Sequence, residues 1–175
     1  MEIRIRRMNE EDVPAARALD MACFSLPWPE SAYHFEVSKN PDSLPLVMEV
    51  LDDQGKWGLV GLMVIWLILD EAHIGTIAID TDYRRKGLAR RLLGEGLLLS
   101  HEKGAVAAYL EVRRGNLAAQ ALYHQFGFTI EGVRLRYYQD NHEDALLLTL
   151  KPMNIDLIKS LIEMWTEEPW SPPSC

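Results

Sequence analysis

Cysteine is scarce in this sequence: the 175 residues include two, Cys23 and Cys175. These lie far apart and share no metal-ligand spacing. The histidines have no such spacing either (His34, His73, His101, His124 and His142). A disulfide-rich scaffold and a zinc site of ordinary pattern are therefore excluded. We expect two free thiols in a reducing cytoplasm and no bound metal.

The sequence also lacks a long hydrophobic run. The longest, from Leu59 to Leu69, is shorter than the roughly 20 residues that a membrane-spanning helix needs. The first seven residues alternate charged and apolar side chains, without the apolar core of a signal peptide. We therefore predict a soluble, cytoplasmic protein that has no membrane partner.

Positive charge is in deficit, with 18 Lys and Arg against 26 Asp and Glu and a net charge of -8. Nucleic-acid-binding proteins favour a basic surface, so we expect no direct nucleic-acid partner. An acidic chain would instead attract a basic substrate. The sequence has neither a Walker loop nor a Gly-x-Gly-x-x-Gly loop, which disfavours a nucleotide triphosphatase and a dinucleotide-dependent enzyme.

Hydrophobic periodicity predicts strands and helices in one domain of mixed α/β class. The predicted strands cover 2–7, 46–51, 58–69, 74–79, 106–112, 128–134 and 143–150. The predicted helices cover 13–22, 30–39, 117–125 and the segment from Leu88 to a C-cap at Gly104. Consecutive strands must pair antiparallel, which excludes an all-parallel sheet, and the later helices still require one parallel crossover.

Residues 153–175 differ in character from the domain predicted over 1–152. Ile158, Leu161, Ile162 and Trp165 share one face of a predicted amphipathic helix, and residues 167–175 are typical of a disordered end. The apolar stripe packs either on the protein's own surface, the interpretation that we favour, or in a dimer contact. We therefore expect a monomer or a weak dimer.

The stretch from Ile74 to Arg91 combines a buried strand, a turn and a small-residue loop that opens a helix. Five basic residues gather in it, although the chain is acidic (Arg84, Arg85, Lys86, Arg90 and Arg91). A helix N-terminus carries unpaired N–H groups and the positive end of the helix dipole, so it binds anions. Gly87 and Ala89 leave the backbone accessible. We predict a phosphate site here rather than a solvated basic turn.

The strand predicted over 106–112 places Leu110 and Val112 on one face and Glu111 on the other. Asn116 then caps the helix that follows. Glu111 lies near the end of its strand, which makes it a candidate site residue. From pattern alone, a solvent-facing glutamate is the commoner fate of such a residue, and the pattern favours an ordinary core aromatic residue for Tyr123.

Together these segments resemble the Gcn5-related N-acetyltransferases (GNAT), and within them the RimI-type ribosomal-protein-alanine N-acetyltransferases. The run from Arg84 to Ala89 matches the signature Arg/Gln-x-x-Gly-x-Gly/Ala between a strand and a helix. The second signature matches Leu110-Glu111-Val112-Arg113, Asn116, Ala121-Leu122-Tyr123 and Gly127-Phe128, and further matches are 24–28, 137–138 and 143–145. The resemblance covers about residues 3–150. It implies a central, mostly antiparallel mixed sheet with splayed strands, flanked by helices.

The resemblance implies acetyl-CoA as co-substrate. Its pyrophosphate is expected on the loop N–H groups (Arg84, Arg85, Lys86, Gly87, Leu88 and Ala89). Its pantetheine arm is expected along the backbone of the preceding strand (Ile77, Ala78 and Ile79), with Asn116 as a further contact. Glu111 is implied as general base and Tyr123 as general acid at the sulfur. Candidates for the acceptor cleft are Trp28, Tyr137 and Tyr138.

The predicted function is acetyl transfer to the N-terminal α-amine of a protein, by direct attack in a ternary complex. A ribosomal protein is the acceptor that the resemblance suggests. Two alternatives remain open: acetylation of a small amine such as a polyamine or amino acid, and a non-catalytic acyl-CoA-binding module. One departure concerns the acceptor side, because RimI-type chains commonly have a bulky residue followed by Asn where this chain has Gly75-Thr76.

Overall fold

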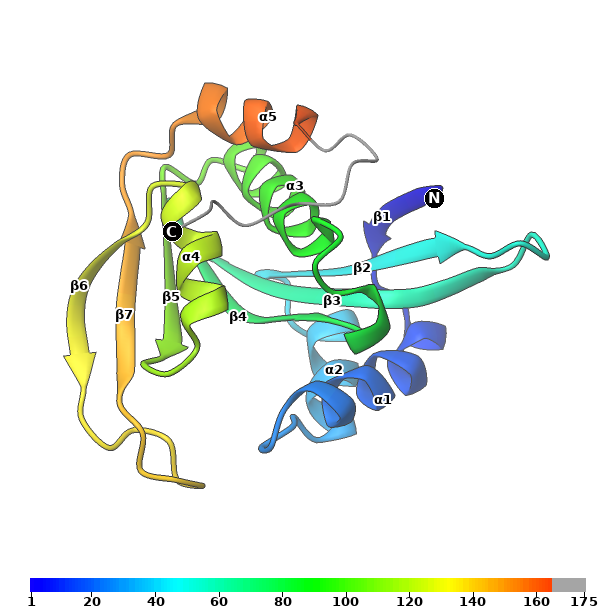
Figure 1. The fold of residues 1–175 in the computed structure, drawn as a ribbon, viewed down its shortest axis with the longest axis horizontal. Coiled ribbons are helices and arrows are strands. Elements are labelled where there is room, and N and C mark those ends of the chain that lie inside the picture. The colour runs from blue at the N-terminus through cyan, green and yellow to red at the C-terminus, as the bar shows by residue number, and fades with distance from the viewer. Residues whose placement is uncertain (165–175) are drawn as a thin grey trace.

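A computed structural model describes residues 1–164, and they form one mixed α/β unit (Figure 1). The strands are β1 (Ile3–Arg7), β2 (Ser43–Leu51), β3 (Trp57–Ile68), β4 (Glu71–Ile79), β5 (Ala107–Arg113), β6 (Thr129–Arg134) and β7 (Ala145–Leu150). The helices are α1 (Val13–Cys23), α2 (Glu30–Ser38), α3 (Leu88–Glu102), α4 (Leu117–Gln125) and α5 (Ile155–Glu163). The predicted order of elements is confirmed.

The bounds of some strands differ from the prediction. β2 begins at Ser43 and β4 at Glu71, each three residues earlier than expected, whereas β7 begins only at Ala145. The β3–β4 connection is tighter than predicted because Leu69 adopts a left-handed conformation (φ 57°), which lets Ile68 pair directly with Glu71. β7 starts late because the backbone of Glu143 bonds within the loop: its N–H donates to Asn141 Oδ1 and its carbonyl accepts from the N–H of Tyr138.

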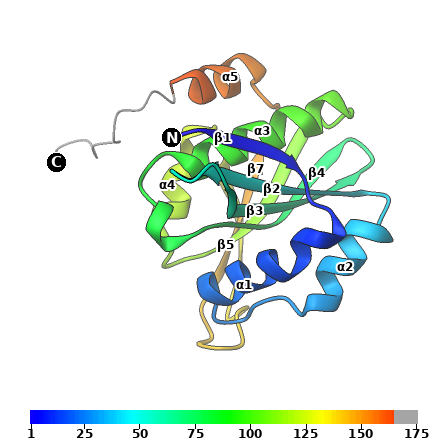
Figure 2. The ribbon, with the colours of Figure 1, turned by 90° about the vertical axis from the view of Figure 1, so that its right-hand side faces the viewer.

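The strands form one sheet in the order β1-β2-β3-β4-β5-β7-β6. Every neighbouring pair is antiparallel except β4 and β5. Helices α1 and α2 cover one face, and α3, α4 and α5 cover the other (Figures 1 and 2). The core is accordingly divided into two clusters of buried side chains, one on each side of the sheet.

Two glycines in α3 permit close packing. A Cβ atom on Gly94 would lie 2.5 Å from Ile162 of α5, and one on Gly96 would lie 2.8 Å from the sulfur of Met63. Ile158 and Ile162 are buried in the same core as α3. The apolar stripe of α5 therefore packs on this chain's own surface. Trp165 and the predicted disordered end at 167–175 lie outside the described residues.

β4 and β5 are parallel only at their beginnings, where residues 71–74 pair with 107–110. At Gly75 the β3–β4 register shifts, since Val64 pairs with Thr76 and Ile65 with Ile74. A bulge of this kind bends its strand and increases the local twist. Beyond Gly75, β4 diverges from β5, so the splayed strands implied by the resemblance are confirmed. The space between them is where the candidate site lies.

Candidate active site

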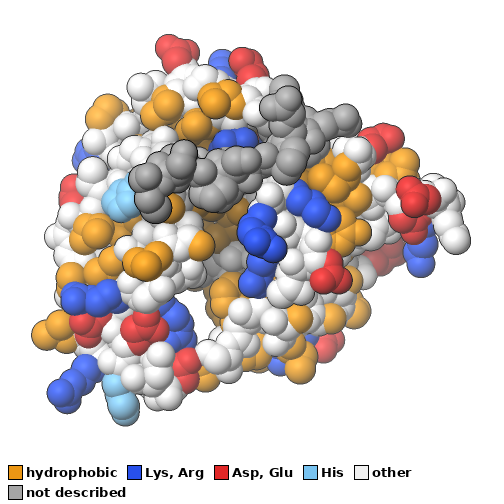
Figure 3. Space-filling view, in the orientation of Figure 1, with side chains coloured by type: hydrophobic (Ala, Val, Ile, Leu, Met, Phe, Trp, Pro, Cys, Tyr) orange, Lys and Arg blue, Asp and Glu red, His pale blue; other side chains and the backbone are white. Residues whose placement is uncertain are grey.

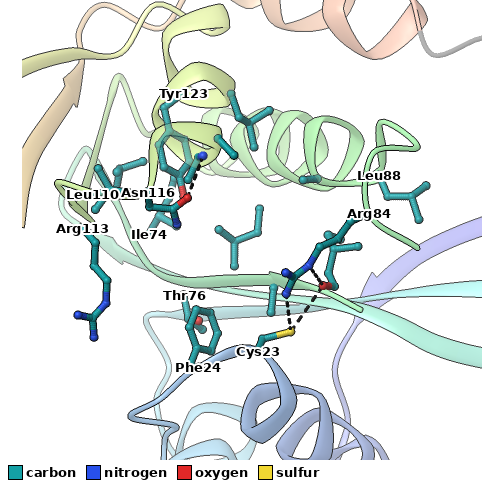
Figure 4. Close-up of a pocket in the computed structure, with 18 of the residues that line it drawn as sticks. Cys23, Phe24, Ile74, Thr76, Arg84, Leu88, Leu110, Arg113, Asn116 and Tyr123 are labelled. Atoms are coloured by element: carbon teal, nitrogen blue, oxygen red, sulfur yellow. Dashed lines mark hydrogen bonds between the residues drawn. The ribbon is translucent and has the colours of Figure 1, made fainter. Parts of the chain in front are cut away.

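A cavity of about 740 Å³ opens where β4 and β5 diverge. Its volume is within the usual range of ligand pockets, roughly 300–1,000 Å³. Figure 3 shows a hollow near the centre of this face, with Lys and Arg side chains gathered along one side. In Figure 4, Tyr123 and Asn116 come from α4 on one side, while Arg84 and Leu88 lie on the other. The cavity thus connects the two signature regions of the sequence.

The predicted phosphate loop forms one end of this cavity. Gly87 is the N-cap of α3 in a left-handed conformation (φ 76°), and Arg85 is left-handed as well (φ 60°). Residues of this conformation turn backbone N–H groups into concave anion-binding arrangements. The loop lies directly before the first turn of α3, whose N–H groups add the positive end of the helix dipole.

The basic side chains of this region do not all face the cavity. Arg84, Arg85 and Arg90 line it, together with Gly87, Leu88 and Ala89. Lys86 is not a lining residue, because its ammonium donates to the carbonyl of Asp82 and lies over the ring of Tyr83. Arg91 pairs with Glu95 at 2.8 Å and lines a smaller pocket elsewhere. Three of the five predicted cations therefore contribute directly to the positive electrostatic potential in the cavity.

The edge of β4 forms the floor between the loop and the rest of the site. Ile77, Ala78 and Ile79 line the cavity and pair with β3 on one side, whereas β5 no longer pairs with them on the other. Backbone groups on a free strand edge can bind an extended amide-containing chain, as a further strand would. The geometry fits the pantetheine arm of CoA.

Glu111 lies on β5 just beyond the last residue that pairs with β4, and it lines the cavity. Its carboxylate pairs with Arg134 of β6 at 3.1 Å, and its side chain is 31% exposed. A hydrogen bond to this carboxylate raises the pKa of the Tyr137 hydroxyl. Arg134 and Tyr137 thus hold the carboxylate in place while it stays accessible from the cavity.

Tyr123 on α4 lines the same cavity and is 5% exposed. Its ring packs edge-on against Phe128, with centroids 5.8 Å apart. Burial strongly raises the pKa of its hydroxyl, so the phenol keeps its proton throughout the neutral and mildly alkaline range. A protonated phenol in this position is a hydrogen-bond donor.

Asn116 caps α4, as predicted: its side-chain oxygen accepts a hydrogen bond from the N–H of Ala119 at 3.2 Å. The residue also lines the cavity. One side chain can therefore order the helix that carries Tyr123 and still present its amide nitrogen to a ligand.

Of the three aromatic residues proposed for the acceptor cleft, Trp28 and Tyr138 line the cavity, and Tyr137 does not. Tyr138 is covered by the guanidinium of Arg113, 3.8 Å from the ring centre. Arg113 also pairs with Asp140 at 2.9 Å, and Arg114 pairs with Asp144 at 3.3 Å. These two arginines therefore order the loop before β7 rather than provide free charge for CoA phosphates.

At the edge of the cavity, a hydrogen bond joins two loops that are far apart in the sequence. Ser25, in the loop between α1 and α2, donates to a carboxylate oxygen of Asp140 at 2.6 Å, across 115 positions of sequence. The Ser25 hydroxyl and the Arg113 guanidinium hold the pKa of Asp140 below its usual value. Ser25, Arg113 and Tyr138 all line the cavity, so this contact encloses the acceptor end.

Sequence reasoning missed several residues at this end. Cys23 lines the cavity, and Arg84 lies 3.5 Å from its sulfur. Asp20 is fully buried and accepts a hydrogen bond from the N–H of Trp28 at 2.6 Å. Asp20 follows Val13 by seven residues and therefore shares its buried helical face, which was an available signal. Ser25 and Asp140 gave no such signal.

Among residues 1–164, no group of three or more His, Cys, Asp or Glu side chains is placed to hold a metal ion. The helices of this same part of the chain are all too short or too polar to cross a bilayer.

Residues 13–128 match the acetyltransferase (GNAT) family. The [ribosomal protein bS18]-alanine N-acetyltransferases of Escherichia coli (strain K12) and Salmonella typhimurium (strain LT2) are 33% and 32% identical to this chain. The alignments cover 83% and 82% of this chain, and 95% and 93% of those proteins.

Solved structures agree with this relationship. The crystal structure of the E. coli ribosomal-protein-S18-alanine N-acetyltransferase superposes with a TM-score of 0.76 at 30% identity, over 87% of this chain and 94% of that one. A chain of the NatC complex bound to Gag peptide and CoA superposes with a TM-score of 0.76 at 25% identity, over 86% of this chain and 99% of that one. The two signature regions, the splayed β4–β5 pair and these relatives together show that the chain belongs to the GNAT acetyltransferase family.

Proposed function

We propose that this chain transfers the acetyl group of acetyl-CoA to the N-terminal α-amine of a protein, in a ternary complex and without a covalent enzyme intermediate. The observation that carries the proposal is that Glu111 and Tyr123 line one cavity whose other end is the left-handed loop of Arg85 and Gly87. The relatives' activity on ribosomal protein bS18 supports a ribosomal protein as acceptor.

Donor binding is divided between backbone and side chains. The N–H groups of the loop and first turn of α3 would hold the pyrophosphate, and Arg84, Arg85 and Arg90 supply charge around it. The edge of β4 from Ile77 to Ile79 would hold the pantetheine amides, although the carbonyl of Ile79 itself accepts a hydrogen bond from Arg84 Nε at 3.1 Å. When bound, acetyl-CoA supplies an activated thioester. Bound along β4, it would present that thioester toward Tyr123 and Glu111, which line the same cavity.

Glu111 removes a proton from the incoming ammonium group, directly or through a water molecule. The α-amine of a protein has a reference pKa near 7.7–8.0, so deprotonation at pH 7 costs about 1 kcal/mol. A lysine amine, near 10.4, would cost ~4.6 kcal/mol. A carboxylate held by Arg134 and Tyr137 is adequate for the first task, which favours an N-terminal amine over a lysine side chain.

The neutral amine attacks the acetyl carbonyl carbon, a carbon–nitrogen bond forms, and the carbon–sulfur bond breaks. The nitrogen gives up one further proton and the departing CoA thiolate takes up one, so that the products are the amide and the free thiol of CoA. Tyr123 donates a hydrogen bond as negative charge develops on the departing sulfur, which stabilises the transition state more than the ground state. Burial keeps its proton available at neutral pH. Cys23, the cysteine among the described residues, contacts Arg84 at the loop and is not required as a nucleophile.

The proposal is tested by incubating the protein with acetyl-CoA and peptides that differ in their acceptor amine. We expect CoA release and a mass gain of one acetyl group with a peptide whose N-terminal alanine is free. The same peptide with a blocked N-terminus and one lysine is the control, and it should react far more slowly. Reaction with polyamines or amino acids alone would show a small-molecule enzyme, and CoA binding without turnover would show a binding module.

A further inference from the structure

Two indole rings form a wall at the acceptor end of the cavity. Trp28, in the loop between α1 and α2, stacks on Trp66 of β3 with ring centres 5.8 Å apart and planes only 3° from parallel. Trp28 lines the cavity together with Gly75, Thr76 and Glu111. Trp66 does not line it but lies behind both Trp28 and Gly75. The wall therefore belongs to the same space as the proposed base.

Gly75 makes room for this wall. A Cβ atom built on Gly75 would lie 2.7 Å from the Trp66 ring, which is closer than van der Waals contact allows. Trp66 therefore occupies the volume that a side chain at position 75 would fill. The glycine at the β4 bulge has two effects: it turns the strand away from β5, and it admits an indole behind the cavity surface.

Two buried carboxylates hold the two indoles. The ring N–H of Trp66 donates to Glu36 at 3.0 Å, and the backbone N–H of Trp28 donates to Asp20 at 2.6 Å. Glu36 is 7% exposed and Asp20 is fully buried. Tyr33 packs against the other side of Trp28, with ring centres 5.6 Å apart. A wall with hydrogen bonds at both members and aromatic packing behind it cannot easily move aside for a ligand.

We propose that the Trp28–Trp66 wall sets the size limit for the first side chain of the acceptor. The inference rests on the proposed function. An amine that reaches Glu111 carries its own Cα substituent into the same cavity, which Trp28, Gly75 and Thr76 also line. Trp28 is the residue that touches the acceptor, and Trp66, Asp20 and Glu36 are positioning residues. The acceptor class is a protein terminus that begins with a small residue, such as Gly, Ala or Ser.

The test compares kcat/KM for two peptides that are identical except for an N-terminal Ala or Leu. Wild type should favour Ala. Trp28→Ala should raise the Leu-to-Ala ratio at least tenfold, since contacts to a few methylene groups in an apolar pocket change specificity by about 10–200-fold. The matched control is Trp57→Ala: like Trp66, Trp57 is a β3 tryptophan, but Arg4 covers it and it lies outside the cavity, so the ratio should not change.

Further variants separate positioning from loss of folding. Trp28→Phe keeps an aromatic ring and should raise the ratio by a smaller factor. Asp20→Ala should raise it as well, because the Trp28 loop loses its anchor. Asp20→Asn keeps an oxygen that can accept from the N–H of Trp28, and it should restore the wild-type ratio. A general loss of stability would lower both rates and leave the ratio unchanged.

A ratio within twofold of wild type in both Trp28 variants, or a wild type that favours Leu, would overturn the inference and leave the proposed function intact. If wild type acetylates neither peptide, both the proposed function and this inference are wrong. The KM for acetyl-CoA should stay constant throughout, because the wall lies outside the phosphate loop.

Discussion

The two ends of the cavity are built in different ways. The proposed donor end comes from one continuous stretch, from Ile74 to Arg90, and the groups proposed to bind the donor are mainly backbone N–H and C=O groups. The acceptor end is assembled from the α1–α2 loop, β3, β5 and the loop before β7, and it depends on side chains such as Trp28 and Tyr138. Backbone groups recognise a cofactor common to many enzymes, whereas side chains from separate elements can make one chain selective for its acceptor.

The reacting groups lie between these ends, and removing one should have the largest effect. We expect Glu111→Gln to lower kcat by about 100-fold or more, because a positioned general base contributes about 10²–10⁴-fold. The KM for acetyl-CoA should stay near wild type, since Glu111 lies outside the phosphate loop. Steady-state kinetics with an N-terminal alanine peptide measure both. Glu131→Gln, an exposed glutamate on β6, is the control. An unchanged kcat for Glu111→Gln would remove this residue from the chemistry.

A change in the phosphate loop should affect the donor alone. Gly87→Ala places a side chain at φ 76°, where an L-residue costs about 1–2 kcal/mol, so the loop relaxes and must regain its shape to bind. We expect the KM for acetyl-CoA to rise about five- to thirtyfold, with little change in the KM for the peptide. The control is Gly55→Ala, which has the same φ of 76° in the β2–β3 turn. If both variants change donor binding equally, the loop conformation is not the cause.

Tyr123→Phe should lower kcat about tenfold, since a hydrogen bond to a charged group contributes at least about 1.5 kcal/mol. The pH profile gives a second test. Burial raises the pKa of Tyr123, so the folded enzyme keeps this proton to a higher pH than an ordinary phenol does. Any loss of rate up to about pH 10 must therefore come from another group, and wild type and Tyr123→Phe should share the same alkaline limb. An alkaline limb that disappears in the variant would contradict this assignment.

The contrast between the two ends also explains what could be predicted from sequence. The loop, the strand before it and the cap at Asn116 depend on neighbours in sequence, so periodicity and helix-end chemistry identified them. The two-residue period of the strand placed Glu111 on the face opposite Leu110 and Val112, whereas its role as general base was implied by the family resemblance. Orientation around the helix was harder to predict. Successive helical residues point about 100° apart, so Arg91 faces Glu95 instead of the cavity although it adjoins Arg90.

The acceptor end was largely beyond prediction because its contacts are long-range. Gly75 was identified as a departure, but nothing near it in sequence indicates that the Trp66 ring fills its space. Of the three aromatic residues predicted for the acceptor cleft, Trp28 and Tyr138 line the cavity, whereas Tyr137 contacts Glu111 and Arg134 and is not a lining residue. The partners of these residues come from other elements. Their geometry exists only once the sheet has brought those elements together.

The smallest effect should come from the contact that joins the two acceptor loops. Ser25→Ala removes the hydroxyl that donates to Asp140, while Arg113 still holds that carboxylate. Because this hydrogen bond is exposed to solvent, we expect a rise of only about two- to tenfold in the peptide KM, with kcat and the KM for acetyl-CoA unchanged. Ser160→Ala, an exposed serine on α5, is the control. If Ser25→Ala instead lowers the peptide KM, the contact restricts entry rather than shaping the bound state, and the enclosed rim would be an obstacle that the acceptor must open.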